Sequence, residues 1–159
     1  MNDMIVRLVQ LPEVTETEEK LKKENIIFRQ AIAPEKSIVM NWVRTNFSEY
    51  WANEVDVAFS NNPVTCFLCQ RDNEILGFSC YESTGKNFFG PTGTLETERN
   101  QGIGKVLLIK SLQGLKNLGY TYGIIGGVGP AAFYEKAVAA KIIEGSEISI
   151  YQNMLKIKK

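Results

Sequence analysis

The stretch Arg-Asn-Gln-Gly-Ile-Gly-Lys at residues 99–105 decides how the rest of this chain is interpreted. Gly102 and Gly104 carry no Cβ, so the backbone can approach a ligand closely there. An amphipathic helix starts inside the stretch, and the first turn of a helix leaves its N–H groups unpaired at the positive end of the helix dipole. These features predict a phosphate or pyrophosphate site, although an ordinary glycine loop before a helix has the same local pattern.

Two well-known phosphate-binding loops do not fit this stretch. A P-loop requires Gly five residues before the Gly-Lys pair and Ser or Thr after the Lys, but Arg99 and Val106 hold those positions. The dinucleotide fingerprint requires a third small residue three positions after the second Gly, where this chain has Leu107. What fits is Arg-x-x-Gly-x-Gly, opening a helix that follows a strand.

Hydrophobic periodicity predicts the elements on either side of the loop. The predicted strands cover residues 4–10, 26–31, 65–70, 75–82, 87–94, 120–128, 142–144 and 149–155. The predicted helices cover residues 35–46, 48–59, the segment from the loop to Gly119, and 131–140, while 13–24 is a short helix or a connection. Pro91 and Gly93 lie inside a predicted strand, so we expect pairing to break on one side of it near residues 91–95.

This order of elements, together with Arg-x-x-Gly-x-Gly, resembles the GNAT superfamily of N-acetyltransferases over about residues 25–156. Residues 88–151 also resemble a bacterial group of that superfamily with no assigned substrate, through Gly-Pro-Thr-Gly at 90–93, Ile-Ile-Gly-Gly-Val-Gly-Pro at 124–130 and Phe-Tyr-Glu-Lys at 133–136. The resemblance implies an α+β fold with a mixed sheet of six or seven strands and about four helices. It divides the chain into an N-terminal extension, residues 1–24, and an acetyltransferase domain, residues 25–159.

The resemblance also implies the co-substrate acetyl-CoA and the residues that hold it. In the family, backbone amides of the loop bind the CoA pyrophosphate, and the fourth and fifth strands splay apart around the pantetheine arm. The matching loop positions are Arg99, Asn100, Gln101, Gly102, Ile103, Gly104 and Lys105, and the matching strand positions are Thr92, Gly93, Thr94 and Leu95.

The resemblance implies a catalytic role for one residue of this chain. Tyr134 aligns with the tyrosine that the family often uses as a general acid toward the CoA thiolate, although a tyrosine packed on the sheet would look the same in sequence. The general base is not identified, because Gly127 and Tyr122 stand where the family often has Asn and a carboxylate. The nearest carboxylates are Glu82, Glu96 and Glu98, and a chain of water molecules is the alternative.

The acceptor implied by the resemblance is a primary amine, on a small molecule or a protein. The family usually binds it with the first two helices and the last strand pair, which here points to Phe47, Tyr50, Trp51 and Tyr151. These aromatic residues could equally belong to the core. Glu49, Glu54 and Asp56 on the second helix could attract a cationic amine or form a solvated face. A homodimer is compatible with the resemblance.

Composition narrows the function classes further. The 18 basic and 18 acidic side chains cancel, so no basic excess points to nucleic acid. No apolar run approaches the roughly 18 residues that span a bilayer, which predicts a cytoplasmic protein without a membrane partner. The chain has no histidine, which excludes a His-based triad and His metal ligands, and we predict no metal site.

The cysteines predict thiols without a redox or metal role. Cys66 and Cys69 lie three positions apart in an apolar run of strand type, where they would face opposite sides of a sheet. Such a pair cannot readily chelate one metal or form a disulfide. We therefore expect Cys66, Cys69 and Cys80 to be buried free thiols.

Two other functions are compatible with parts of the sequence. Gly127-x-Gly129-x-x-Ala132 resembles a dinucleotide fingerprint, with Glu144 as a ribose ligand, but few residues follow and Pro130 removes an amide donor. A non-catalytic protein that binds CoA as a sensor or interaction module would share the predicted fold and loop.

Overall fold

The computed structural model describes residues 1–158, and Lys159, the last residue of the predicted domain, lies outside this range. Within it the chain forms a sheet of seven strands in the order β2-β3-β4-β5-β6-β1-β7. The strands are β1 (Met4–Arg7), β2 (Ile26–Gln30), β3 (Cys66–Arg71), β4 (Glu74–Tyr81), β5 (Phe88–Thr94), β6 (Tyr122–Ile125) and β7 (Lys141–Ile142). The helices are α1 (Thr15–Lys22), α2 (Lys36–Asn46), α3 (Glu49–Ser60), α4 (Ile103–Asn117) and α5 (Ala131–Val138), with short 3₁₀ turns at Ala33–Glu35 and Glu96–Glu98.

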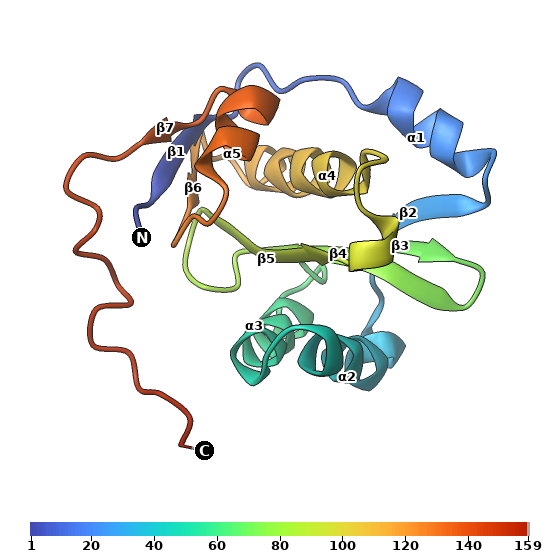
Figure 1. Cartoon of the computed structure of the whole chain (residues 1–159), viewed down its shortest axis with the longest axis horizontal. Helices are drawn as coiled ribbons and strands as arrows, with labels where there is room; N and C mark the ends of the chain where they lie inside the picture. Colours follow the sequence, from blue (N-terminus) through green and yellow to red (C-terminus); the bar gives the residue numbers. More distant parts are fainter. Residues whose placement is uncertain (159) are drawn as a thin grey trace.

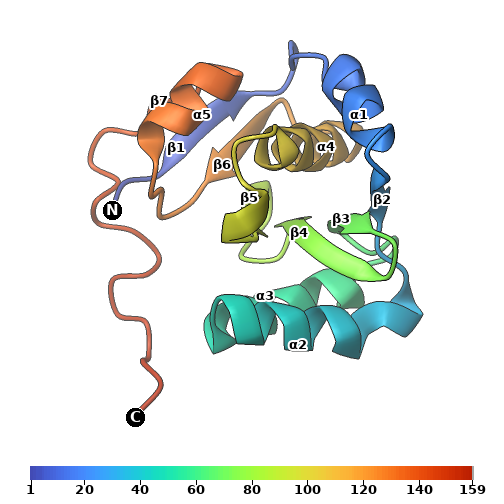
Figure 2. The same cartoon turned by 45° about the vertical axis from the view of Figure 1, so that its right-hand side comes forward.

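The helices cover the two faces of the sheet unequally. Helices α2 and α3 pack together on one face, while α4 lies on the other face with α1 and α5 on either side of it (Figures 1 and 2). Buried side chains form two clusters, one on each face. Cys66 belongs to the cluster under α2 and α3, and Cys69 belongs to the cluster under α4. All three cysteines are buried and free, which confirms the prediction from strand alternation.

The pairing of β5 breaks where Pro91 and Gly93 predict it. Parallel pairing with β6 is limited to Phe88 with Ile124 and Phe89 with Ile125. On its other side β5 stays paired with β4 as far as Thr94, with an irregular register opposite Ser79 and Tyr81. The strands β5 and β6 therefore separate beyond Phe89, and a one-sided opening forms in the middle of the sheet.

The N-terminal strand occupies an unexpected place. β1 lies between β6 and β7 and pairs antiparallel with both, from Met4 opposite Ile125 to Arg7 opposite Tyr122, and from Met4 opposite Ile142. The backbone continues these ladders through hydrogen bonds from Val128 N to Asn2 O and from Ile143 N to Asp3 O, both 2.9 Å.

The prediction of a strand at residues 149–155 is wrong. β6 pairs with β5 on one edge and with β1 on the other, and the second edge of β1 pairs with β7. The C-terminal segment therefore finds no free strand edge at this part of the sheet. Instead it forms turns, with hydrogen bonds from Gln152 N to Ser149 O and from Met154 N to Tyr151 O, both 3.1 Å. Its apolar side chains Ile148 and Ile150 are exposed as a result.

None of the helices in residues 1–158 is long and apolar enough to cross a membrane.

Candidate active site

The loop before α4 has the backbone of an anion-binding site. Asn100 and Gly102 have positive φ angles of 69° and 96°. The first helical hydrogen bond of α4 runs from Val106 N to Gly102 O, at 3.1 Å. The backbone N–H groups of residues 100–105 donate no hydrogen bond to any described residue. Six consecutive free donors at the positive end of a 15-residue helix can therefore hold a phosphate or pyrophosphate.

Side chains near the loop hold its shape. Glu98 accepts hydrogen bonds from Arg71 Nη1 and Gln101 Nε2, each at 2.8 Å. The Arg71 guanidinium and, to a lesser degree, the Gln101 amide lower the pKa of Glu98, so this carboxylate stays ionised and anchors the loop. Arg99 and Lys105 are exposed at the loop and supply positive charge.

Helix α1 forms a wall of the loop that sequence reasoning missed. A Cβ on Gly102 would lie 2.8 Å from Cγ2 of Thr17 in α1. An ion pair of 3.1 Å between Lys110 Nζ and Glu18 holds α1 against α4. No local signal connects residues 13–24 with the loop, because the contact spans more than 80 residues of chain.

The end of β5 borders the opening between β5 and β6 and connects it with the loop before α4. Leu95 N donates to Leu76 O of β4, at 2.9 Å. Backbone groups of alternate residues point to opposite edges of a strand, so those of Thr92 and Thr94 point away from β4 and into the opening. Thr94 O accepts a bond of 3.3 Å from Arg99 Nε, which links this edge to the loop. Gly93 lies beneath the ring of Phe47, which a Cβ there would overlap.

Tyr134 lies on α5 where β5 and β6 begin to separate. Its ring packs edge-on against Phe89, the last residue of β5 that pairs with β6, with ring centroids 6.3 Å apart. The residue is 7% exposed, and its hydroxyl makes no hydrogen bond to any described residue. Burial raises the pKa of Tyr134 to about 12. The phenol is therefore protonated at neutral pH and free to donate.

The predicted aromatic acceptor wall separates into two groups. Trp51 and Phe47 are both partly buried, and they pack against each other and against Phe78 of the cluster under α2 and α3, with ring centroids 5.2 to 6.2 Å apart. Tyr50 instead accepts a hydrogen bond of 2.6 Å from Ile157 N in the C-terminal segment. Tyr151 lies on that same segment.

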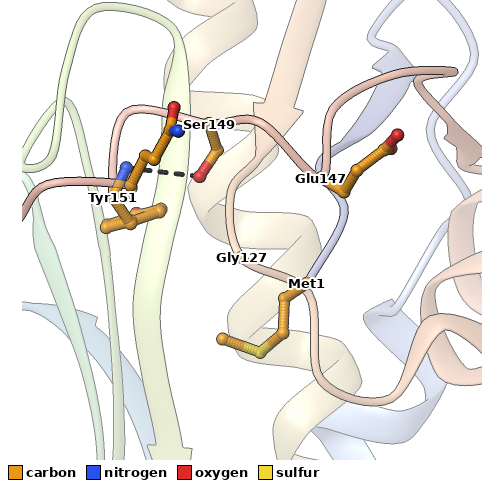
Figure 3. Close-up of a pocket in the computed structure, with 6 residues that line it drawn as sticks. Met1, Gly127, Glu147, Ser149 and Tyr151 are labelled. Carbon is orange, nitrogen blue, oxygen red and sulfur yellow. Dashed lines mark hydrogen bonds between the residues drawn. The ribbon is translucent and has the colours of Figure 1, made fainter.

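Tyr151 packs at the end of β6 and borders a cavity of about 200 Å³. Its ring lies beside Gly127, where a Cβ would be 3.3 Å from Cε2 of Tyr151. Figure 3 shows Gly127 between Met1 and the C-terminal segment, with Glu147 pointing away from Tyr151 and the hydrogen bond from Tyr151 N to Ser149. The cavity is lined by Met1, Gly127, Glu147, Ser149, Tyr151 and Gln152. A larger cavity of about 460 Å³ near Phe67, Tyr81 and Gly114 includes no residue of the loop.

The carboxylates considered as bases from the sequence are mostly engaged elsewhere. Glu82 accepts hydrogen bonds from Tyr120 Oη at 2.8 Å and from Asn87 N at 2.5 Å, so it closes the β4–β5 turn. Glu98 anchors the loop, and Glu96 is exposed. On α3, Glu49 pairs with Arg44 and Asp56 pairs with Lys36.

Glu54 on α3 differs from these carboxylates. It accepts a hydrogen bond from the Thr84 hydroxyl of the β4–β5 turn and forms no ion pair with any residue in 1–158. Burial raises its pKa, and the bond from Thr84 acts in the opposite direction.

Among residues 1–158, no group of three His, Cys, Asp or Glu side chains lies close enough together to hold a metal ion.

No protein-family model matches the chain, and no curated protein matches it. Solved structures do match. The GCN5-related glucosamine N-acetyltransferase region of a fungal multi-domain GH3 β-N-acetylglucosaminidase is 17% identical with a TM-score of 0.71, over 89% of this chain and 19% of that one. A GCN5-related N-acetyltransferase from Sphaerobacter thermophilus is 17% identical with a TM-score of 0.68, over 89% of this chain and 48% of that one.

A third match extends this pattern. A GCN5-related N-acetyltransferase from Kribbella flavida is 14% identical with a TM-score of 0.53, over 89% of this chain and 53% of that one. The chain thus spans about a fifth to a half of the proteins it matches. At this level of identity the matches establish architecture, and they agree with the seven-stranded sheet and its parallel β5–β6 pair. The chain therefore has the fold of the GCN5-related N-acetyltransferases.

Proposed function

We propose that this protein is an acetyl-CoA-dependent N-acetyltransferase that transfers the acetyl group directly to a primary amine. The observation that carries the proposal is the row of six unpaired backbone donors at residues 100–105, placed beside a one-sided opening of the sheet. In a protein with this fold, the combination of free loop amides and a sheet opening supports a CoA pyrophosphate on the loop and an extended pantetheine arm along β5.

The residues of the chain take distinct roles in this proposal. The loop amides donate to the pyrophosphate, and the backbone of Thr92 and Thr94 borders the pantetheine arm. Tyr134 donates its proton to the departing thiolate. No cysteine acts as a nucleophile, because all three are fully buried and burial raises the pKa of Cys69 and Cys80.

Gly104→Val tests the loop with little disturbance of the fold. A Cβ on Gly104 would meet only Thr94 Oγ1 at 3.9 Å and Phe133 Cζ at 4.0 Å, whereas a side chain on Gly102 would be strained by its positive φ and would meet Thr17. Because a helical Cβ tilts toward the helix N-terminus, the added side chain would occupy space beside the loop, between Thr94 and Phe133. We expect the variant to fold and to lose acetyl-CoA binding by at least about 100-fold, measured by calorimetric titration.

Gln113→Val, which makes the same β-branched change on an exposed part of α4, is the matched control and should bind as the wild type does. Unchanged affinity in folded Gly104→Val would overturn the assignment of the loop. Release of CoA with a panel of primary amines then tests catalysis. Binding without any release would identify a non-catalytic CoA-binding protein instead.

A further inference from the structure

A cavity on the α4 side of the sheet lies apart from the loop and from the opening in the sheet. Helix α4 packs against β3, β4 and β5, and α1 packs against β2. Beside the last turns of α4, a cavity of about 460 Å³ lies over Gln30 of β2, Phe67 of β3 and Tyr81 of β4. A volume of this size is within the range of small-molecule sites, roughly 300–1,000 Å³.

The hydroxyl of Tyr81 is the feature of this cavity that packing does not explain. Tyr81 is 5% exposed, and its hydroxyl forms no hydrogen bond with any residue in 1–158. Among the unexposed side chains of these residues, Ser83 Oγ is the polar atom that is both unpaired and sealed from solvent. The Tyr81 hydroxyl is therefore unpaired but reaches the cavity. Burial, and to a lesser degree the charge of Glu82, raise the pKa of Tyr81, so the phenol is a protonated donor at neutral pH.

Helix α4 leaves room for this phenol. A Cβ on Gly114 would lie 2.4 Å from Tyr81 Cζ and 2.7 Å from Tyr81 Oη, so a larger residue there would displace the ring. Glycine inside a helix is destabilising relative to alanine, and a buried hydroxyl without a partner also lowers stability. Two unfavourable features thus meet at one point that borders the cavity, which is typical of a site where binding outweighs stability.

The wall offers a flat aromatic surface with a hydrogen-bond donor and an acceptor beside it. The rings of Phe67 and Tyr81 stack at 24° with centroids 6.2 Å apart, which favours a planar aromatic group against them. Gln30 pairs opposite Phe67 in the sheet, and its Nε2 donates to Val64 O at 2.7 Å. Gln30 Oε1 is then left as an acceptor with no partner in residues 1–158.

The wall also carries no net charge. Of the described residues that line the cavity, Lys110 is the charged one, and its Nζ pairs with Glu18 of α1 at 3.1 Å. A charged ligand would lose hydration here without gaining a free counter-ion, whereas a neutral polar ligand needs only hydrogen bonds. One donor and one acceptor next to an aromatic surface match a primary carboxamide attached to an aromatic ring.

We propose that this cavity binds a neutral aromatic molecule that carries a carboxamide group. The aromatic ring lies against Phe67, the Tyr81 hydroxyl donates to the carboxamide oxygen, and the carboxamide nitrogen donates to Gln30 Oε1. The site is separate from the loop, because Gly114 lies about 16 Å along the α4 axis from Ile103, at a rise of about 1.5 Å per residue. This inference therefore does not depend on the proposed function.

Benzamide is the probe for a direct test. Titrated into the isotope-labelled chain and followed by NMR, it should shift the backbone amide signals of Phe67 and Gly114 saturably, with a Kd at or below about 1 mM. Benzoate has the same ring with a negative charge, and cyclohexanecarboxamide has the same amide without a flat ring. Each should bind at least about tenfold more weakly than benzamide. Equal affinity for all three, or no saturable shift at Phe67 and Gly114, would overturn the site.

Tyr81→Phe separates binding from packing. The ring stays beside Phe67 and Gly114 and the hydroxyl that is removed has no protein partner, so the midpoint of urea unfolding should stay the same or rise. Benzamide affinity should fall by about tenfold, because the donor to the carboxamide is lost. Tyr122→Phe, at an exposed tyrosine, is the matched control and should bind benzamide as the wild type does. A lower unfolding midpoint or an unchanged benzamide affinity in Tyr81→Phe would contradict the proposal.

Phe67→Leu is a second variant, which keeps the Tyr81 hydroxyl and removes the flat surface. Benzamide affinity should fall by about tenfold, whereas the weaker binding of cyclohexanecarboxamide should change by less than about threefold. Equal losses for the two amides would show that the cavity does not select a planar ring.

Discussion

At the scale of single residues, burial separates the groups that can react from those that only pack. Tyr134 is buried and its hydroxyl bonds to no residue in 1–158, whereas Glu54 is partly buried and pairs with no cation in that range. Phe47 and Trp51 have the residue types of an acceptor wall, and their partly buried rings also pack against the cluster under α2 and α3. Residue type alone does not distinguish these cases, because the difference lies in what surrounds each side chain.

Tyr134→Phe tests the proposed general acid. The phenylalanine keeps the ring against Phe89, so the fold and the affinity for acetyl-CoA should change little. Turnover should fall by about 10- to 1000-fold, because the departing thiolate loses its proton donor. Pre-steady-state kinetics is the suitable measurement, since slow product release can hide a chemical defect. Tyr122→Phe, at an exposed tyrosine, is the control, and wild-type chemistry in Tyr134→Phe would leave Tyr134 with a packing role only.

At the scale of elements, β1 shows how a short strand can decide the shape of a sheet. Its residues alternate between buried Met4 and Val6 and exposed Ile5 and Arg7. That alternation predicts a strand with one covered face but does not specify its partners. By pairing with both β6 and β7, β1 joins the two ends of the chain in one sheet and leaves residues 143–158 outside it.

Val6→Ala measures what β1 contributes. Val6 is fully buried in the cluster under α4 and lies opposite Gly123 of β6. Removing two methyl groups there should lower the free energy of unfolding by about 2 kcal/mol, from lost apolar burial and the cavity left behind. Val9→Ala, just beyond the strand and 63% exposed, should cost less than about 0.5 kcal/mol. Urea titration gives both values, and equal effects would mean that β1 is not a central strand in solution.

At the scale of the whole molecule, two apolar clusters on either side of one sheet hold ionisable groups that are stable only when neutral. Burial, and to a lesser degree the charge of Glu98, raise the pKa of Cys69 to about 12, and burial alone does the same for Tyr134. Both groups ionise at lower pH in the unfolded chain, near pH 9 for the thiol and pH 10 for the phenol. Between these values and about pH 12 the folded state binds more protons than the unfolded state.

Stability should therefore fall as the pH rises through this window. The contribution of both groups is complete below about pH 9 and is lost progressively toward pH 12. Cys69→Ala removes one of the two groups and should make the slope of unfolding free energy against pH shallower, while Gln113→Ala on the exposed face of α4 should not. Denaturant titrations from pH 7 to 10.5 would measure this, and an identical slope in Cys69→Ala would contradict the assigned burial effect.

The sequence by itself was sufficient for features that depend on neighbouring residues. Hydrophobic periodicity predicted four of the five helices and seven of the eight expected strands, and it left residues 13–24, where α1 lies, as a short helix or a connection. Pro91 and Gly93 predicted the broken pairing of β5, because a missing donor and a missing side chain act locally. Gly102 and Gly104 predicted a loop whose amides stay unpaired, because the end of a helix leaves them so in any fold.

Only the tertiary structure decided features that depend on residues far apart in the chain. The alternation in residues 149–155 is compatible with a strand, but β1 fills the ladder position that this strand would need. The contact of Thr17 with the loop and the hydrogen bond from Thr84 to Glu54 each join segments with no local signal of their meeting. A sequence pattern specifies which face of an element is buried, whereas partners and pKa values follow from competition among all elements for the same edges and the same core.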